Sequence, residues 1–219
     1  MKNAVVLVMA VFAGFACGAN LMIDDFESYA DDAALNAAWV VQTNGGAATE
    51  SIVNINGSNQ MLFEIVGGDP YWTQTKYSVP GASWNNYGVN FRAQGHTAIS
   101  VDLYIPSKTE PGLEYLDGSG GLAYVTLFDC WGQTVLSAEY DNSGGGYTAS
   151  GTGPLTLEID FDTYTSAGMN LDNVAIIATG FKNNYYQVGG MFVDNVMLVP
   201  EPASLIILAA GSLLIRKRK

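Results

Sequence analysis

Aromatic side chains set among amides and acids are the residues of this sequence best suited to chemistry. The group comprises Trp72, Trp84, Tyr87, Arg92, Trp131, Tyr185 and Tyr186. Most of its members lie in or beside polar turns that contain Asn, Gln and Asp. A sugar presents apolar C–H faces and hydroxyl groups, so a sugar-binding cleft needs flat rings flanked by hydrogen-bonding side chains. The alternative is that these rings cap the ends of a hydrophobic core.

A search for catalytic residues finds little. His96 is the single histidine, which excludes a site built from several histidines. The spaced motifs of serine hydrolases, zinc proteases and phosphate-binding loops are missing. Two carboxylates can hydrolyse a glycoside, but the sequence marks no particular pair. Glu158, Asp160 and Asp162 are explained as the solvent-exposed face of a strand. We therefore predict a protein that is not an enzyme and has no catalytic residues.

The charge of the chain narrows the choice of ligand. The formal net charge is −12, and of nine Lys and Arg residues only Lys76, Arg92, Lys108 and Lys182 lie outside the two terminal segments. Such an acidic domain is unsuited to nucleic acid, because phosphate contacts need cations. It suits calcium, which prefers oxygen ligands. Cys130 is the only cysteine after residue 19, so no disulfide is expected within the mature chain.

The elements that must hold these residues are predicted to be strands. Apolar and polar residues alternate strictly in 99–105 and 155–162, which indicates strands with one buried face. Weaker strand patterns occupy 51–55, 60–66, 87–92, 122–128, 135–140, 174–181 and 191–199. Glycine-rich turns separate them, and a single helix is predicted over residues 31–40. The pattern predicts an all-β protein, a β-sandwich of short antiparallel strands.

Two short motifs near the ends of this region carry a resemblance. The first reads Asp24-Asp25-Phe26-Glu27, and the second reads Phe192-Val193-Asp194-Asn195-Val196. Together they resemble the galactose-binding-like jelly rolls, the fold of many carbohydrate-binding modules. The resemblance implies one jelly-roll domain over residues 20–198. It also implies a structural Ca²⁺ between the first and last strands, with Glu27 and Asp194 as ligands and Asp25 as a weaker candidate.

The position of Asp194 gives this calcium site a physical reason. Asp194 shares a predicted strand face with Phe192 and Val196, which places its carboxylate near the core. A buried carboxylate is costly unless it is paired or bound to a metal. The alternative is that Asp194 accepts hydrogen bonds from the backbone of the first strand.

The first 19 residues have the composition of an export signal. A short cationic start precedes the apolar run 4–16, and small residues follow, with cleavage expected after Ala19. Cys17 raises the alternative of a lipoprotein. The sequence before it fits a lipidation motif poorly, because Gly14 stands where a branched aliphatic residue is expected.

The last residues, 199–219, show three parts in a fixed order. The motif Val199-Pro200-Glu201-Pro202 precedes the uncharged run 203–215 and four terminal cations. This arrangement resembles the PEP-CTERM sorting signal of Gram-negative bacteria. The resemblance implies export, transient anchoring in the inner membrane through a hydrophobic helix, and processing by an exosortase. The alternative is a terminal amphipathic or buried helix.

The sequence thus predicts an exported surface or extracellular protein whose β-sandwich binds polysaccharide without catalysis. The ligand would be the cell's own exopolysaccharide or a glycan of its surroundings. A structural protein of the biofilm matrix or cell surface, without sugar binding, is the alternative. A glycan-active enzyme is a third possibility.

Overall fold

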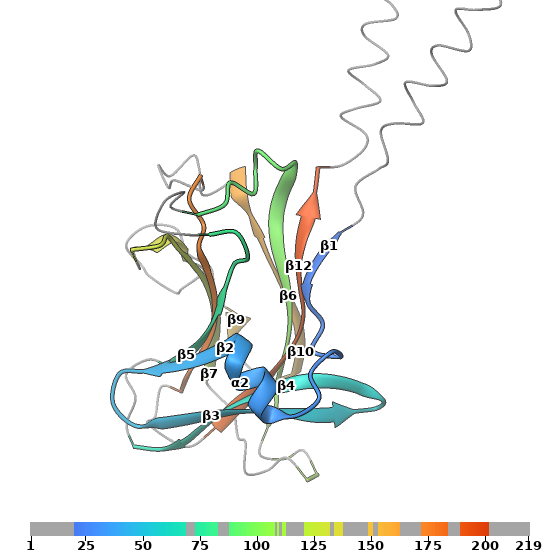
Figure 1. The fold of residues 1–219 in the computed structure, drawn as a ribbon. Helices are drawn as coiled ribbons and strands as arrows, with labels where there is room; N and C mark the ends of the chain where they lie inside the picture. Colours follow the sequence, from blue (N-terminus) through green and yellow to red (C-terminus); the bar gives the residue numbers. More distant parts are fainter. Residues whose placement is uncertain are drawn as a thin grey trace, which may run out of the picture.

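The computed structural model describes the greater part of residues 20–201. The described residues are 20–68, 73–82, 88–107, 109, 111–112, 121–131, 134–137, 149–150, 153–162, 172–183 and 189–201. The expected export signal 1–19 and residues 202–219 lie outside them. The described strands form two sheets that face each other, seen side by side in Figure 1. The predicted β-sandwich is confirmed.

One sheet, called sheet A, contains the first and last strands of the described chain. Its members are β1 (Leu21–Asp24), β3 (Ala47–Ile55), β4 (Ser58–Gly67), β6 (His96–Ile105), β10 (Gly153–Asp160) and β12 (Gly189–Pro200). The strand order is β10-β6-β12-β4-β3, and β1 pairs with the final part of β12. In Figure 1 the blue β1 therefore lies beside the red β12.

The second sheet, called sheet B, packs against the inner face of sheet A. Its members are β2 (Trp39–Thr43), β5 (Thr73–Ser78), β7 (Gly121–Phe128), β8 (Thr134–Ser137), β9 (Ala149–Ser150) and β11 (Ile176–Asn183). The order is β2-β5-β11-β7-β8, with β9 paired to β7. Neighbouring strands in both sheets run antiparallel.

The core lies between the sheets and follows the predicted alternation. On β6 the apolar side chains Ile99, Val101, Leu103 and Ile105 are buried, while the intervening residues from Ser100 to Tyr104 face outward. Trp39 is fully buried in this core, as predicted. Burial of this apolar area is the main force that holds the two sheets together.

The helix α2 (Asp32–Ala38) is shorter than predicted. Its N-cap is Asp31, whose side chain accepts a hydrogen bond from the Ala34 amide at 2.9 Å. The prediction extended the helix to Val40, whereas Trp39 and Val40 begin β2 and pair with Tyr77 and Lys76. Tertiary pairing overrides the local pattern here, because the Trp39 ring is needed in the core.

A buried carboxylate fixes the chain between β1 and β2. Asp24 accepts three hydrogen bonds: from the Phe26 amide at 2.9 Å, the Tyr29 hydroxyl at 2.5 Å and the Trp39 indole N–H at 2.8 Å. Phe26 adopts a positive φ of 60°, so the backbone turns sharply after Asp24. The first acid of the opening motif therefore has a structural role.

Two predicted boundaries differ from the structure. The strand expected over 87–92 is reduced, within the described residues, to an isolated bridge between Val89 and Val174, after which the chain turns. At the other end, β12 continues past the expected domain boundary at residue 198 and reaches Pro200, which pairs with His96. The Glu201 amide still donates a hydrogen bond to the Gly95 carbonyl at 3.0 Å. Proline can occupy this last position because its nitrogen, which has no hydrogen to donate, needs no further hydrogen bond within the sheet.

Among the described residues, no helix combines the length and apolar character needed to cross a membrane. The apolar run 203–215 lies outside them.

Candidate functional site

The outer face of sheet A carries a row of apolar side chains that crosses four strands. The strand register aligns Leu62, Phe192, Tyr104 and Pro154, from β4 through β12 and β6 to β10. The rings of Phe192 and Tyr104 are stacked, with centroids 5.9 Å apart and planes at 24°. Phe192 is buried, whereas Tyr104 is partly exposed. We call these four residues the aromatic row.

A row of polar side chains runs parallel to the aromatic row, two residues along each strand. It consists of Gln60, Asp194, Asp102 and Thr156, and we call it the polar row. Asp102 is held at both oxygens, by the Thr156 hydroxyl at 2.7 Å and the Asn195 side-chain amide at 3.0 Å. These bonds fix the direction of the Asp102 carboxylate.

The two rows together line a groove on the surface of sheet A. The groove has a volume of about 290 Å³, and members of both rows form its walls. One wall offers a ring and the other offers carboxylate, amide and hydroxyl groups. This is the combination of surfaces that a sugar ring requires.

The polar row places carboxylates unusually close together. Asp194 lies directly opposite Asp102, an arrangement of like charges that destabilises an antiparallel pair. Burial raises the pKa of Asp194, the bond from the Asn195 amide opposes this rise, and the charges of Asp102, Glu27 and Asp25 add to it. The groove therefore has a marked negative potential.

Asp194 does not face the main core, contrary to the expectation from its strand pattern. It shares a face with Phe192 as predicted, but that face is the outer one, and Asp194 is partly exposed. A register shift follows at Asn195, whose φ is 47°, and it turns Val196 into the core. The bulge breaks the period of two on which the prediction relied.

The three predicted calcium ligands lie near one another but are engaged in local hydrogen bonds. Glu27 Oε1 accepts from the Ser58 hydroxyl and the Asn59 amide, both at 2.9 Å. Asp25 accepts from the Glu27 amide at 3.2 Å, and Asp194 accepts from the Asn195 amide at 2.8 Å. In the part of the chain that the structure describes, no three acidic, histidine or cysteine side chains converge to hold a metal ion. Calcium at this position stays a prediction.

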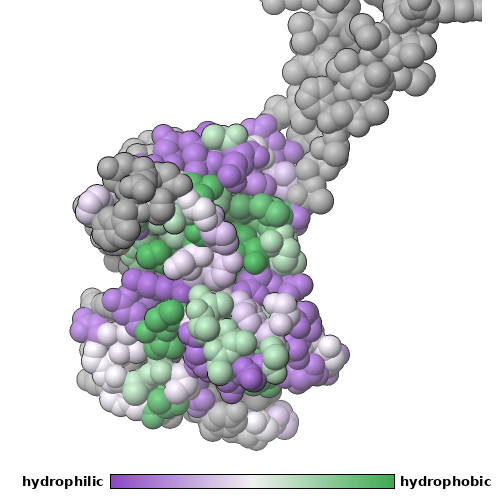
Figure 2. Space-filling view, in the orientation of Figure 1, coloured by the Kyte–Doolittle hydropathy of each residue, from purple (hydrophilic) through white to green (hydrophobic). Residues whose placement is uncertain are grey.

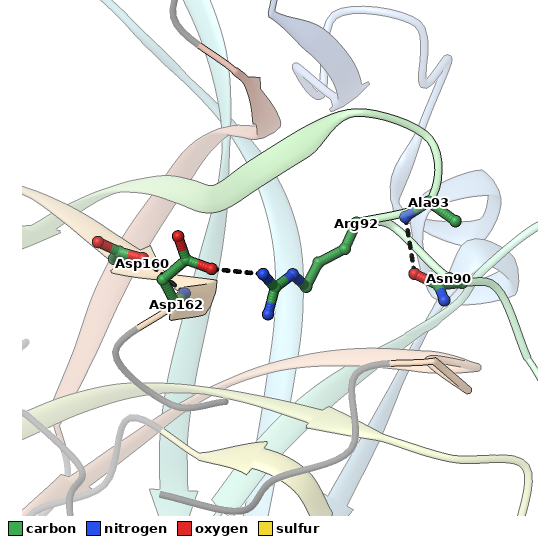
Figure 3. Close-up of polar contacts among 5 residues, drawn as sticks. All are labelled: Asn90, Arg92, Ala93, Asp160 and Asp162. Atoms are coloured by element: carbon green, nitrogen blue, oxygen red, sulfur yellow. Dashed lines mark hydrogen bonds and ion pairs between the residues drawn. The ribbon is translucent and has the colours of Figure 1, made fainter. Parts of the chain in front are cut away.

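The predicted aromatic group is described only in part. Trp131 lies in the turn after β7, and its side chain is 61% exposed. Its backbone amide donates a hydrogen bond to the Asp129 carboxylate at 2.9 Å. Arg92 forms an ion pair with Asp162 at 2.5 Å (Figure 3). The remaining five residues, Trp72, Trp84, Tyr87, Tyr185 and Tyr186, lie outside the described residues.

Two hydrogen bonds of the Asn90 side chain stabilise the turn that carries Arg92. Asn90 donates a hydrogen bond from its side-chain amide to Asp172 at 2.6 Å and accepts one from the Ala93 amide at 2.8 Å. Figure 3 shows the guanidinium group reaching across to Asp162, away from Asn90 and Ala93. Arg92 is thus held beside a carboxylate, which reduces the positive charge it can offer to a ligand.

A second hollow, of about 260 Å³, opens between the two sheets beside β1. Its walls are mostly apolar and include Leu21, Met22 and Phe91. Figure 2 shows hydrophobic residues set among hydrophilic ones in both the upper and the lower half of this face of the molecule. A lining so poor in hydrogen-bonding groups does not suit a sugar.

The sequence pattern does not identify most groove residues as a binding site, although it does place two of them on the exposed face of a strand. Asp102 and Tyr104 alternate with buried residues in the clearest strand pattern, and an aromatic ring on a wet face is informative. Their alignment with Gln60 and Thr156 depends on strand order, which the sequence does not contain.

Comparison with known proteins supports the fold. The structure is similar to the family 11 carbohydrate-binding module of the cellulosomal cellulase Lic26A-Cel5E of Clostridium thermocellum, with a TM-score of 0.50 and 18% identity over 84% of this chain and 96% of that one. It is also similar to a family 28 module described as specific for non-crystalline cellulose, with a TM-score of 0.50 and 14% identity over 83% of this chain and 95% of that one. No protein-family model and no curated protein matches the sequence. The chain thus has the β-sandwich fold seen in carbohydrate-binding modules.

Proposed function

We propose that this protein binds polysaccharide without catalysis, and that the groove on the outer face of sheet A is the binding surface. The observation that carries this proposal is the alignment of the aromatic row beside the polar row across four strands. The fold supports it, since solved structures of similar architecture are carbohydrate-binding modules. The fold alone does not identify a ligand.

The groove residues have distinct roles in this proposal. Tyr104 offers its partly exposed ring to the C–H face of a sugar, and Phe192 beneath it keeps that ring in place. Asp102 and Asp194 accept hydrogen bonds from sugar hydroxyls, and such bonds to charged acceptors are the stronger kind. The groove is an open surface that crosses the strands, so it suits an extended chain more than a small enclosed ligand.

The test is affinity electrophoresis of the full chain in gels that contain soluble β-glucans, xylan, mannan or the cell's own exopolysaccharide. We expect retardation by at least one glycan, and a loss of about tenfold or more in affinity when Tyr104→Ala removes the ring. Trp131→Ala is the matched control, because it removes an exposed ring from outside the groove. The melting temperature of each variant shows that it is folded.

The alternative outcomes separate the two surfaces. Retardation that survives Tyr104→Ala and disappears with Trp131→Ala would move the binding site to the turn after β7. Absence of retardation by every glycan would instead favour a structural surface protein.

We also propose a structural Ca²⁺ held by Glu27 and Asp194, with Asp25 nearby. The support is electrostatic. Burial raises the pKa of Asp194 most, and the charges of Asp102, Glu27 and Asp25 raise it further. A bound cation would relieve the repulsion among these acids. With so few side-chain ligands, the remaining ligands would be backbone or amide oxygens. EDTA should lower the melting temperature and Ca²⁺ should restore it, and Asp194→Asn should abolish both effects. An unchanged melting temperature under both treatments would rule the ion out.

We further propose that the protein is exported and sorted through its terminal segments. This proposal rests on the residues at 1–19 and 199–219 and on their order along the chain. Of the sorting motif, Val199, Pro200 and Glu201 are described and Pro202 is not. In a host with an exosortase, the Pro202→Ala chain should accumulate unprocessed in the inner-membrane fraction. Equal processing of both chains would contradict the proposal.

A further inference from the structure

A polar cluster lies inside the sandwich, away from the groove. Glu50 on β3 is only 4% exposed and pairs with the core residue Phe63, so its side chain points between the sheets. The Thr75 hydroxyl on β5 donates a hydrogen bond of 2.6 Å to Glu50 Oε2. This bond joins sheet A to sheet B through the core.

Two more threonines lie on the same inner face of sheet B. Thr75 is directly opposite Thr179 on β11, and Thr73 precedes Thr75 by two residues on β5. Directly opposite side chains in an antiparallel pair have Cβ atoms about 5 Å apart. Thr73, Thr75 and Thr179 are all fully buried. These three hydroxyl groups therefore belong to the inner face of sheet B from which Thr75 contacts the buried carboxylate.

Most of this oxygen cluster has no hydrogen-bond partner within the described residues. Glu50 Oε1, Thr73 Oγ1 and Thr179 Oγ1 are buried and unbonded, so they do not bond to one another either. Buried polar atoms normally have a partner, so three unbonded ones on the inner faces of the two sheets are exceptional. A species bound between the sheets at this point would supply partners that these oxygens lack.

The charge of Glu50 limits what that species can be. Of the lysine and arginine side chains that the structure describes, Lys76 lies on the outer face of sheet B over the Phe128 ring, and Arg92 is paired with Asp162. Neither faces Glu50. Once Glu50 has lost its proton, a water molecule would satisfy the hydroxyls but would leave the carboxylate charge uncompensated in the core.

We propose that Glu50, Thr73, Thr75 and Thr179 form an internal binding site for a monovalent cation such as Na⁺. All four groups offer oxygen atoms, which hard cations prefer. The site carries a single negative charge, which one monovalent ion neutralises, whereas calcium sites gain affinity from a higher ligand charge. The ion would link the two sheets at the point where Glu50 and Thr75 already connect them.

The first test measures the melting temperature of the full chain at pH 8.5 and constant ionic strength, with NaCl replacing choline chloride stepwise. We expect a saturable rise of several degrees in Na⁺, because an ion that binds only the folded state stabilises it. Glu50→Gln should remove this dependence and Thr179→Val should weaken it. Glu64→Gln, a carboxylate on the outer face of the adjacent strand, should keep it.

The second test locates the ion directly. A crystal of the protein soaked in RbCl or thallium acetate should show an anomalous peak between Glu50 and the three threonines, and a crystal of the Glu50→Gln variant should not. Water density without an anomalous peak, or equal melting temperatures in NaCl and choline chloride, would overturn the proposal. Since Glu50→Gln keeps the size of the side chain, loss of folding is not expected to obscure either test.

Discussion

Two buried carboxylates of this sandwich, Asp24 and Glu50, differ sharply in the number of hydrogen bonds that they accept. Asp24, 7% exposed, lies where β1 ends and accepts hydrogen bonds from three donors, with both of its oxygens engaged. Glu50 on β3 is buried to a similar degree, yet within the described part of the chain it accepts one hydrogen bond, and its Oε1 has no partner.

The difference shows that the arrangement of donors, and not the depth of burial, decides what a buried acid does. The donors around Asp24 are two N–H groups and a phenol, and together they engage both of its oxygens. Glu50 has the Thr75 hydroxyl as its donor, and burial raises its pKa to about 7 against the opposing effect of that bond. Asp24 therefore anchors the chain, while Glu50 is left able to exchange a proton or to bind an ion.

The largest expected change in stability comes from removing Asp24, the buried acid whose two oxygens are both hydrogen-bonded. Asp24→Ala removes three hydrogen bonds and leaves the Trp39 indole N–H buried without an acceptor. We expect the free energy of unfolding to fall by about 4 kcal/mol, measured by urea denaturation. Asp25→Ala, measured in EDTA, is the control, because Asp25 accepts one bond at a less buried position. Similar losses in both variants would show that Asp24 is no anchor.

The next effect concerns the pH dependence that Glu50 gives to stability. In the unfolded chain Glu50 loses its proton near its ordinary pKa of 4.5, whereas in the fold it keeps the proton to about 7. The unfolded state therefore binds fewer protons between these values, and stability falls as the pH rises through this window. The loss is about 3 kcal/mol and is complete above the folded pKa.

Urea denaturation in choline chloride between pH 4.5 and 8 measures this loss. Glu50→Gln should flatten the curve, and Na⁺ should reduce its slope by stabilising the ionised form. The groups that face Glu50 from the packed strands are Phe63 and the threonines, and the acid nearest to it on α2, Asp32, is bonded to the Ile52 amide. A curve with the same slope in Glu50→Gln would assign the pH dependence to other acids.

Much of the sandwich could be predicted because alternation records which side of a strand is buried. The alternation predicts strands over 99–105 and 155–162, and the structure has β6 over His96–Ile105 and β10 over Gly153–Asp160, with Trp39 in the core as predicted. Asp194 does not follow this rule, since the bulge at Asn195 reverses the faces of the strand and leaves no mark in the pattern. The sequence does not predict the environment of Glu50 for a related reason. Its partner Thr75 lies on another strand and contacts it only across the core.

The smallest expected effect lies at the groove, where solvent reaches the carboxylates. Asp102→Asn removes the charge opposite Asp194 and keeps an oxygen for the Thr156 hydroxyl, while the Asn195 amide can turn to accept in place of donating. Since Asp102 is one of the charges that raise the pKa of Asp194, that pKa should fall in the variant, as an NMR titration of the Asp194 carboxyl would show. The free energy of unfolding should change by less than about 1 kcal/mol, because the two acids are partly exposed and solvent screens their repulsion. A change as large as that expected for Asp24 would mean that the groove, too, is governed by buried hydrogen bonds, and the contrast between an open binding face and a closed interior would no longer hold.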